Sequence, residues 1–134
     1  MKIRKILTES KTLLSSLINL RAEIAAAAQS VYDDWIEEQE AGGGICDDIA
    51  SVISSILSHY DINNTSGGHD GDDHAYTIAF NDAEAFIVDI PYDTYEIGGG
   101  YNWTKINGVK FSPDDVVIEK TQRPDWADDD LNEY

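Results

Sequence analysis

The order of the apolar patterns is the feature that most constrains the fold of this chain. Apolar residues recur with helical spacing over about residues 8–40 and again over about 45–60, whereas residues 74–80 alternate, an apolar run follows at 85–90, and aromatic residues lie two apart within 101–106. Helices at one end of a chain and strands at the other are typical of an α+β domain. We therefore predict an α+β fold in which N-terminal helices pack on a four- or five-stranded antiparallel sheet.

Glycine and polar residues set the expected element boundaries. The first helical segment is one long helix or two in succession, capped by Thr8 or Ser10, and it ends before the glycine run at 42–44. The polar stretch 61–73 predicts a loop. A tight turn at Asn81 and Asp82 joins the first two expected strands. The expected strands lie at residues 74–80, 85–90, 101–106 and 116–120, with 109–111 extending the sheet.

Length and composition predict one domain. The chain has 134 residues, of which 42% are hydrophobic, so residues 1–120 can form a compact domain. Residues 121–134 are acidic, and we expect a disordered tail there. The sequence has neither a membrane-length apolar run nor a signal-peptide pattern. With a single cysteine it forms no internal disulfide, so we expect a cytoplasmic protein, in the host cytoplasm if the chain is phage-encoded.

The charge is strongly negative and unevenly placed. The formal net charge is −17, and residues 22–104 hold 17 acidic residues and no Lys or Arg. Such a surface repels nucleic acid and attracts cationic partners, so we expect no direct nucleic-acid partner and no membrane partner. Two interpretations stay open. The acidity keeps the protein soluble, or it imitates DNA and binds a basic host protein, as acidic phage inhibitors of defence enzymes do.

Three residues point to thiol chemistry. Cys46 opens the second apolar helix, His74 begins one strand and Asp89 ends the next. A two-residue turn places His74 opposite Asp89, whereas a four-residue loop places Asp89 opposite Tyr76, diagonal to His74, and both registers keep the pair on one face. The imidazole would take the thiol proton and the carboxylate would fix its tautomer. The first amides of the helix, at Cys46 and Asp47, would hold an oxyanion.

The same residues also have a purely structural interpretation. A lone cysteine is often an inert core residue, and one His and one Asp can coincide by chance among many acids. Three observations favour a triad: the glycines at 42–44 permit close approach to the sulfur, Asp89 lies within an apolar run, and His74 borders a polar loop. Asp47 and Asp48 oppose thiolate formation, so activation of the sulfur would depend on the histidine.

Further residues are candidates for the cleft around the triad. Gln39 and Asp47 are possible oxyanion donors, and Gly44 allows close approach of a ligand. The aromatic candidates for the cleft lining are Tyr76, Tyr101 and Trp103. A metal site formed by His69, Asp70, Asp72, Asp73 and His74 is the alternative chemistry, but its spacing fits no calcium loop. We therefore predict no metal and no cofactor.

The motifs around these residues resemble those of a known superfamily. Gly-Gly-Gly-Ile-Cys46-Asp-Asp-Ile-Ala, Asp-Asp-His74-Ala-Tyr and Val-Asp89-Ile-Pro look like the Cys, His and Asp boxes of papain-like cysteine peptidases, especially the transglutaminase-like and NlpC/P60-like branches. The stretch from Tyr95 to Trp103, with Pro-Asp-Asp-Val-Val-Ile from residue 113, is similar to small uncharacterised phage and bacterial proteins. The resemblance covers roughly residues 30–120. Where the branches usually carry a Trp two residues after the histidine, this chain has Tyr76.

The resemblance implies a papain-like core and a cysteine that acts on an amide bond through a thioester. Cys46 would be the nucleophile, His74 the base and then the acid, and Asp89 the orienting group. The compact spacing of the boxes leaves room for a small site. We therefore predict a small cysteine hydrolase or amidase (a thiol protease in its peptidase form), with a peptide or other amide substrate that is basic or neutral. The alternative from another class is an acidic phage-type interaction protein whose triad is unused.

Overall fold

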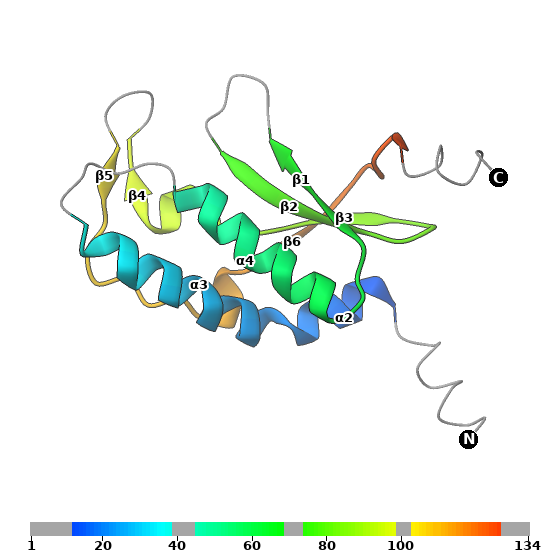
Figure 1. Ribbon diagram of the computed structural model, residues 1–134, viewed down its shortest axis with the longest axis horizontal. Helices are drawn as coiled ribbons and strands as arrows, with labels where there is room; N and C mark the ends of the chain where they lie inside the picture. Colours follow the sequence, from blue (N-terminus) through cyan, green and yellow to red (C-terminus); the bar gives the residue numbers. More distant parts are fainter. Residues whose placement is uncertain (1–11, 39–44, 69–73, 99–102, 127–134) are drawn as a thin grey trace.

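The computed structural model describes residues 12–38, 45–68, 74–98 and 103–126. Its helices lie on one side of an antiparallel sheet (Figure 1). The order of strands in the sheet is β1-β2-β3-β6, and a separate two-stranded sheet pairs β4 with β5. The elements are α2 (Leu13–Asn19), α3 (Arg21–Ile36), α4 (Ile45–His59), β1 (Asn64–Gly68), β2 (Ala75–Phe80), β3 (Ala85–Asp89), η1 (Tyr92–Thr94), β4 (Glu96–Ile97), β5 (Thr104–Lys105), η2 (Pro113–Asp115) and β6 (Val117–Thr121). The predicted α+β class is confirmed, with four strands in the main sheet.

The first helical segment consists of two helices in succession, as one of the two alternatives predicted. Thr12 caps α2, because its hydroxyl accepts a hydrogen bond of 3.0 Å from the Ser15 amide. Leu20 separates α2 from α3. The predicted caps Thr8 and Ser10 lie outside the described residues.

Helix α4 carries the apolar stripe that joins the helices to the sheet. Ile45, Ile49, Ile53 and Leu57 are spaced by four residues and are all buried. The acidic residues in its first turn interact favourably with the helix dipole. In Figure 1 α3 and α4 run in opposite directions side by side. The core therefore lies between this helix pair and the sheet.

The loop between β2 and β3 has four residues. Phe80 pairs with Ala85, and the Asn81 amide donates a 3.0 Å hydrogen bond to the Glu84 carbonyl. The Asn81 side chain accepts hydrogen bonds of 2.9 and 2.8 Å from the Ala83 and Glu84 amides. The predicted tight turn at Asn81 and Asp82 is therefore wrong, because the asparagine side chain stabilises a longer loop.

Three further predictions about the strands need correction. Residues 64–68, placed in a loop by their polar composition, form β1 and pair with β2. In the predicted strand 101–106, only Thr104 and Lys105 are in a described strand, and they pair with β4 instead of the main sheet. Residues 109–111 are not a strand, and they bind Gln29 of α3 instead. The Phe111 amide donates a 2.7 Å hydrogen bond to Gln29 Oε1, and Gln29 Nε2 donates a 3.1 Å hydrogen bond to the Val109 carbonyl.

The last described residues stay on the sheet. Thr121 ends β6, Arg123 Nε donates a 2.8 Å hydrogen bond to the Asn81 carbonyl, and the Trp126 ring meets Phe80 edge-on at 5.5 Å. Within the described ranges, no helix has both the length and the apolar character needed to cross a bilayer.

Candidate active site

The three residues of the predicted triad come from three elements that meet at one end of the sheet. Cys46 lies in the first turn of α4, His74 directly precedes β2, and Asp89 is the last residue of β3. Because β2 and β3 are antiparallel neighbours, the start of one lies beside the end of the other. The first turns of α4 are fixed to β2 by Thr77, whose hydroxyl donates a 2.8 Å hydrogen bond to the Ala50 carbonyl. The fold thus brings a thiol, an imidazole and a carboxylate together.

Asp89 and His74 form a close hydrogen-bonded pair. His74 Nε2 lies 2.6 Å from Asp89 Oδ2, and the two side chains are only 15% and 11% exposed. With Thr77 paired to Val88, the next position along places Asp89 opposite Tyr76, so His74 is diagonal to its partner. This is the register that the four-residue loop predicts. A short contact with little solvent access is the geometry of a charge-assisted hydrogen bond.

The second ring nitrogen of His74 is not used by Asp89. Nδ1 is buried and makes no hydrogen bond of ordinary geometry within the described residues. The hydrogen bond to Asp89, followed by the interaction with Cys46, raises the pKa of His74 from 6.5 to about 10, although burial opposes the charge. The imidazole is therefore protonated at neutral pH. A protonated imidazole next to a thiol favours the thiolate.

Asp89 experiences two opposing effects. Burial raises the pKa of this carboxyl, and the hydrogen bond from His74 partly offsets that rise. Cys46 is buried as well, with 8% of the residue exposed. The site thus holds its charges in a setting with little water, where hydrogen bonds between charged groups are strong.

Tyr95 is a site residue that the sequence prediction missed. It is fully buried, its ring meets Trp35 and Phe111 edge-on, and its hydroxyl has no hydrogen-bond partner in the described parts of the chain. Burial, and then the negative charges of Cys46 and Asp89, raise the pKa of Tyr95 above its usual range. The hydroxyl is thus a buried donor near the triad. Only its packing against Trp35 and Phe111 reveals it, because no motif marks a tyrosine of this kind.

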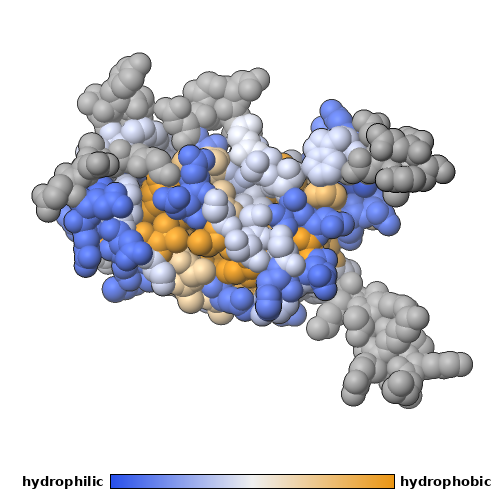
Figure 2. Space-filling model, in the orientation of Figure 1, coloured by the Kyte–Doolittle hydropathy of each residue, from blue (hydrophilic) through white to orange (hydrophobic). Residues whose placement is uncertain are grey.

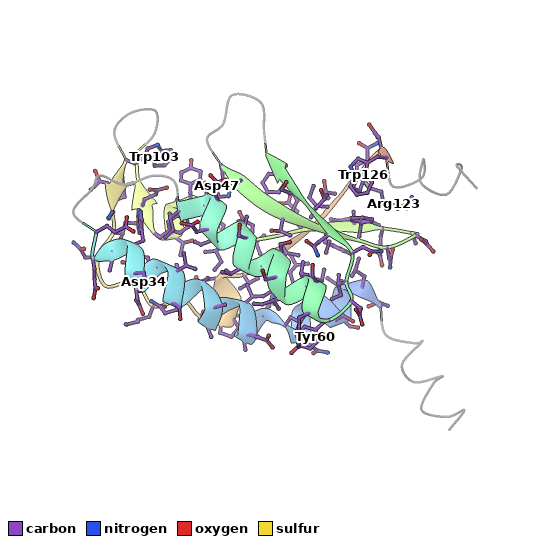
Figure 3. The ribbon with its side chains drawn as sticks, in the orientation of Figure 1. Asp34, Asp47, Tyr60, Trp103, Arg123 and Trp126 are labelled. Atoms are coloured by element: carbon purple, nitrogen blue, oxygen red, sulfur yellow. The ribbon has the colours of Figure 1, made fainter. Side chains whose placement is uncertain are left out.

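Aromatic residues border the histidine. The ring of Tyr92 lies 5.6 Å from His74, and Trp103 meets Tyr92 edge-on at 5.2 Å. Tyr76 is buried, with its ring 6.3 Å from the imidazole. Trp103 and Asp47, both labelled in Figure 3, lie at the same end of the protein. Two of the predicted cleft aromatics, Tyr76 and Trp103, therefore lie near the imidazole, the second through Tyr92.

The other predicted site residues divide into two groups. Asp47 is exposed in the first turn of α4, next to the candidate nucleophile. Gln39, Gly44 and Tyr101 lie outside the described residues, as do residues 69–73 of the alternative metal site. Comparison with family models, with curated proteins and with solved structures finds no match to this chain. Membership of the papain-like superfamily stays a prediction from the sequence motifs.

Proposed function

We propose that this protein is a small cysteine hydrolase or amidase that cleaves an amide bond with Cys46, His74 and Asp89. The observation that carries the proposal is the 2.6 Å contact between His74 Nε2 and Asp89, with the Cys46 thiol as the other neighbour of the same ring. A structural core histidine needs no buried carboxylate on one side and a thiol on the other. Catalysis by a cysteine, a base and an orienting group requires the imidazole to lie between the thiol and the carboxylate.

The chemistry follows from the positions of the protons. The Cys46 sulfur attacks the amide carbonyl carbon, and the imidazolium of His74 gives its proton to the leaving nitrogen as the carbon–nitrogen bond breaks. The acyl group remains on sulfur as a thioester. His74, now neutral, takes a proton from water, which attacks the thioester and releases the acid and the thiolate. Asp89 holds the ring so that Nδ1 faces the sulfur throughout.

The start of α4 supplies stabilisation for the negative oxygen that forms on the carbonyl. The first amides of a helix have no acceptor within the helix, so those of Cys46 and Asp47 can donate to this oxygen. Removing one such donor typically costs about two orders of magnitude in rate. The acidic surroundings favour a basic or neutral substrate over an acidic one.

Alkylation of the single cysteine tests the proposal. The rate of Cys46 modification by iodoacetamide is measured by intact mass at pH 6 to 8, with Cys46→Ala to confirm the site. We expect His74→Ala to slow labelling at least tenfold at pH 6, because the thiol then lacks its cationic neighbour. The matched control is His59→Ala, since His59 is exposed at the far end of α4. Slow labelling that is equal in the native protein and in His74→Ala would contradict the proposal.

Acyl transfer provides a second test. With 4-nitrophenyl acetate as an activated acyl donor, we expect an acetyl thioester on Cys46 that forms and then hydrolyses in the native protein. His74→Ala should accumulate no such species. A thioester that forms but never turns over would limit the proposal to acyl transfer without hydrolysis.

The charge supports a second function, that of an acidic protein that binds a basic host protein. Residues 22–104 contain no Lys or Arg, so this part of the chain has a continuous negative charge excess. Binding to a basic nucleic-acid-binding partner would then be lost at raised salt and would be unchanged in Cys46→Ser. Binding that requires the intact thiol, or that does not exist at physiological salt, argues against this function.

A further inference from the structure

A polar groove runs along α4 away from the triad. It has a volume of about 450 Å³ and lies between α4 and the β1 end of the sheet. Its first residues, Asp47 on α4 and Ala75 on β2, are the direct neighbours in sequence of Cys46 and His74. The lining is completed by Ala50, Ser51, Ser54, Ser55, Asn64, Thr65, Ser66 and Thr77. In Figure 2 a pale band of intermediate hydropathy crosses the middle of the face that carries α4 and β1.

The helix side of the groove is a row of hydroxyl groups. Ser51 lies four residues after Asp47, and Ser54 and Ser55 lie three and four residues after Ser51, which places them on one side of α4. From Asp47 to Ser55 the helix rises by about 12 Å at 1.5 Å per residue. An extended chain covers that distance in about three to four residues at 3.3 Å each. The groove therefore has the length of a short extended peptide.

The opposite side of the groove is β1, and Ala75 and Thr77 of β2 line it as well. Neighbouring residues of a strand face opposite sides of the sheet, yet Asn64, Thr65 and Ser66 all line the groove, so its lining includes the backbone of β1. Within the described sheet, β1 is an edge strand. The Phe80 amide donates to the Asn63 carbonyl at 2.9 Å, which sets the alternation of the ladder. The backbone groups of Asn64 and Ser66 consequently point away from β2.

The groove contains one charged residue. Asp47 is the only acid among its lining residues, and none of them is basic. This carboxylate lies at the end of the groove next to the candidate nucleophile. A ligand with a cationic side chain at that end is favoured, and one with an acidic side chain is disfavoured.

We propose that the groove binds an extended peptide as an added strand on β1, with a Lys or Arg side chain beside Asp47. This inference rests on the proposed function for its biological meaning, because such a peptide would present its amide to Cys46. Its physical basis is separate from the chemistry. Strand addition uses backbone hydrogen bonds for affinity and side-chain contacts for specificity, and the groove offers both.

Peptide binding to Cys46→Ala, which lacks the nucleophile, tests the inference without catalysis. The probe is a fluorescein-labelled pentapeptide amide, Ala-Ser-Ala-Lys-Gly, compared with the same peptide carrying Glu for Lys and with a backbone N-methylated form. Fluorescence anisotropy gives each Kd at 0.15 M salt. We expect the Lys peptide to bind at least tenfold more tightly than the Glu peptide, and N-methylation to weaken binding about fivefold per hydrogen bond removed.

Matched variants locate the binding. Asp47→Asn should remove most of the preference for Lys, whereas Asp48→Asn, an exposed neighbour outside the groove lining, should keep it. Ser51→Tyr fills the groove and should weaken binding at least tenfold, whereas Ser30→Tyr on the exposed side of α3 should leave Kd unchanged. Ser66→Pro should weaken binding about fivefold by removing one outward amide. If it does not fold, Ser51→Tyr still decides.

Equal binding of the Lys, Glu and N-methylated peptides, or equal effects of Asp47→Asn and Asp48→Asn, would overturn the groove assignment. That result would leave the iodoacetamide test of the triad untouched. Conversely, groove-specific binding together with labelling that is independent of His74 would support the peptide site and refute the hydrolase.

Discussion

Replacing Asp89 with Asn isolates the interaction that organises the site. The substitution keeps the shape of the side chain and removes its negative charge, so His74 loses the contact that most raises its pKa. An opposite charge within hydrogen-bond distance typically shifts a pKa by about 1–3 units. We therefore expect the pKa of His74 to fall from about 10 by about 1–3 units in Asp89→Asn.

The pair of His74 and Asp89 also makes the free energy of unfolding depend on pH, and its contribution falls as pH rises. Because the folded-state pKa of His74 exceeds the unfolded value of 6.5, the folded protein retains this proton while the unfolded chain releases it. The stabilisation is fully present below pH 6.5 and is lost as pH rises towards about 10. At about 1.4 kcal/mol per pKa unit the limit is about 5 kcal/mol, and partial solvent access reduces it to roughly 2–3 kcal/mol.

Two measurements test the pKa of His74 and the pH dependence of stability. Proton NMR of the imidazole C2 resonances gives the pKa of His74, since the chain has only three histidines. Urea unfolding from pH 6 to 10 gives the free energy of unfolding. Asp89→Asn should be less stable than the native protein by about 2–3 kcal/mol at pH 6, and the difference should shrink towards pH 10.

The control for charge is Asp48→Asn, which removes an exposed carboxylate from the first turn of the same helix as Cys46. It should change stability by less than about 1 kcal/mol, equally at all these pH values. A native His74 that titrates near 6.5, or a pKa change as large in Asp48→Asn as in Asp89→Asn, would show that Asp89 does not raise the pKa of His74.

Two further substitutions test the contacts that hold the site in place. Thr77→Val removes the 2.8 Å hydrogen bond from the Thr77 hydroxyl to the Ala50 carbonyl, so the free energy of unfolding should fall by about 1 kcal/mol in urea, and iodoacetamide labelling of Cys46 should change at the same time. No loss of stability would mean that this buried bond contributes nothing. Lys105→Met removes the ammonium that donates to the Trp35 carbonyl at 2.6 Å and lies 4.7 Å from the Trp35 ring centroid. We expect a loss of about 1–2 kcal/mol, measured by thermal unfolding, and a Tm equal to that of the native protein would contradict it.

Much of the fold could be predicted from apolar spacing. The isoleucines of α4, the alternation over residues 74–80 and the apolar run in β3 were sufficient, because each of these elements contributes buried side chains to the same core. Strand β1 could not be predicted, since Asn64–Gly68 has the composition of a loop. It is a strand because its backbone pairs with β2, and an edge strand needs few apolar side chains.

The candidate site was predicted in part for the same reason. The closeness of His74 and Asp89 follows from strand pairing, which short-range patterns specify. The contribution of Tyr95 depends on the path of a segment that leaves the sheet after β3, and no spacing rule specifies such a path. Sequence patterns thus identified the site residues at helix and strand ends and missed Tyr95, which lies in the irregular segment after β3.

The segment between β3 and β6 has a consequence for how such a protein can diversify. Strands β3 and β6 are adjacent in the sheet, so the chain leaves after Asp89 and returns beside the strand that it left. In its described residues the intervening segment places Tyr92 against the imidazole and Trp103 against Tyr92, and it adds no strand to the main sheet. The length and sequence of this segment can therefore change during evolution, and with them the ligands that can approach the sulfur. The strand pairing that aligns His74 with Asp89 need not change.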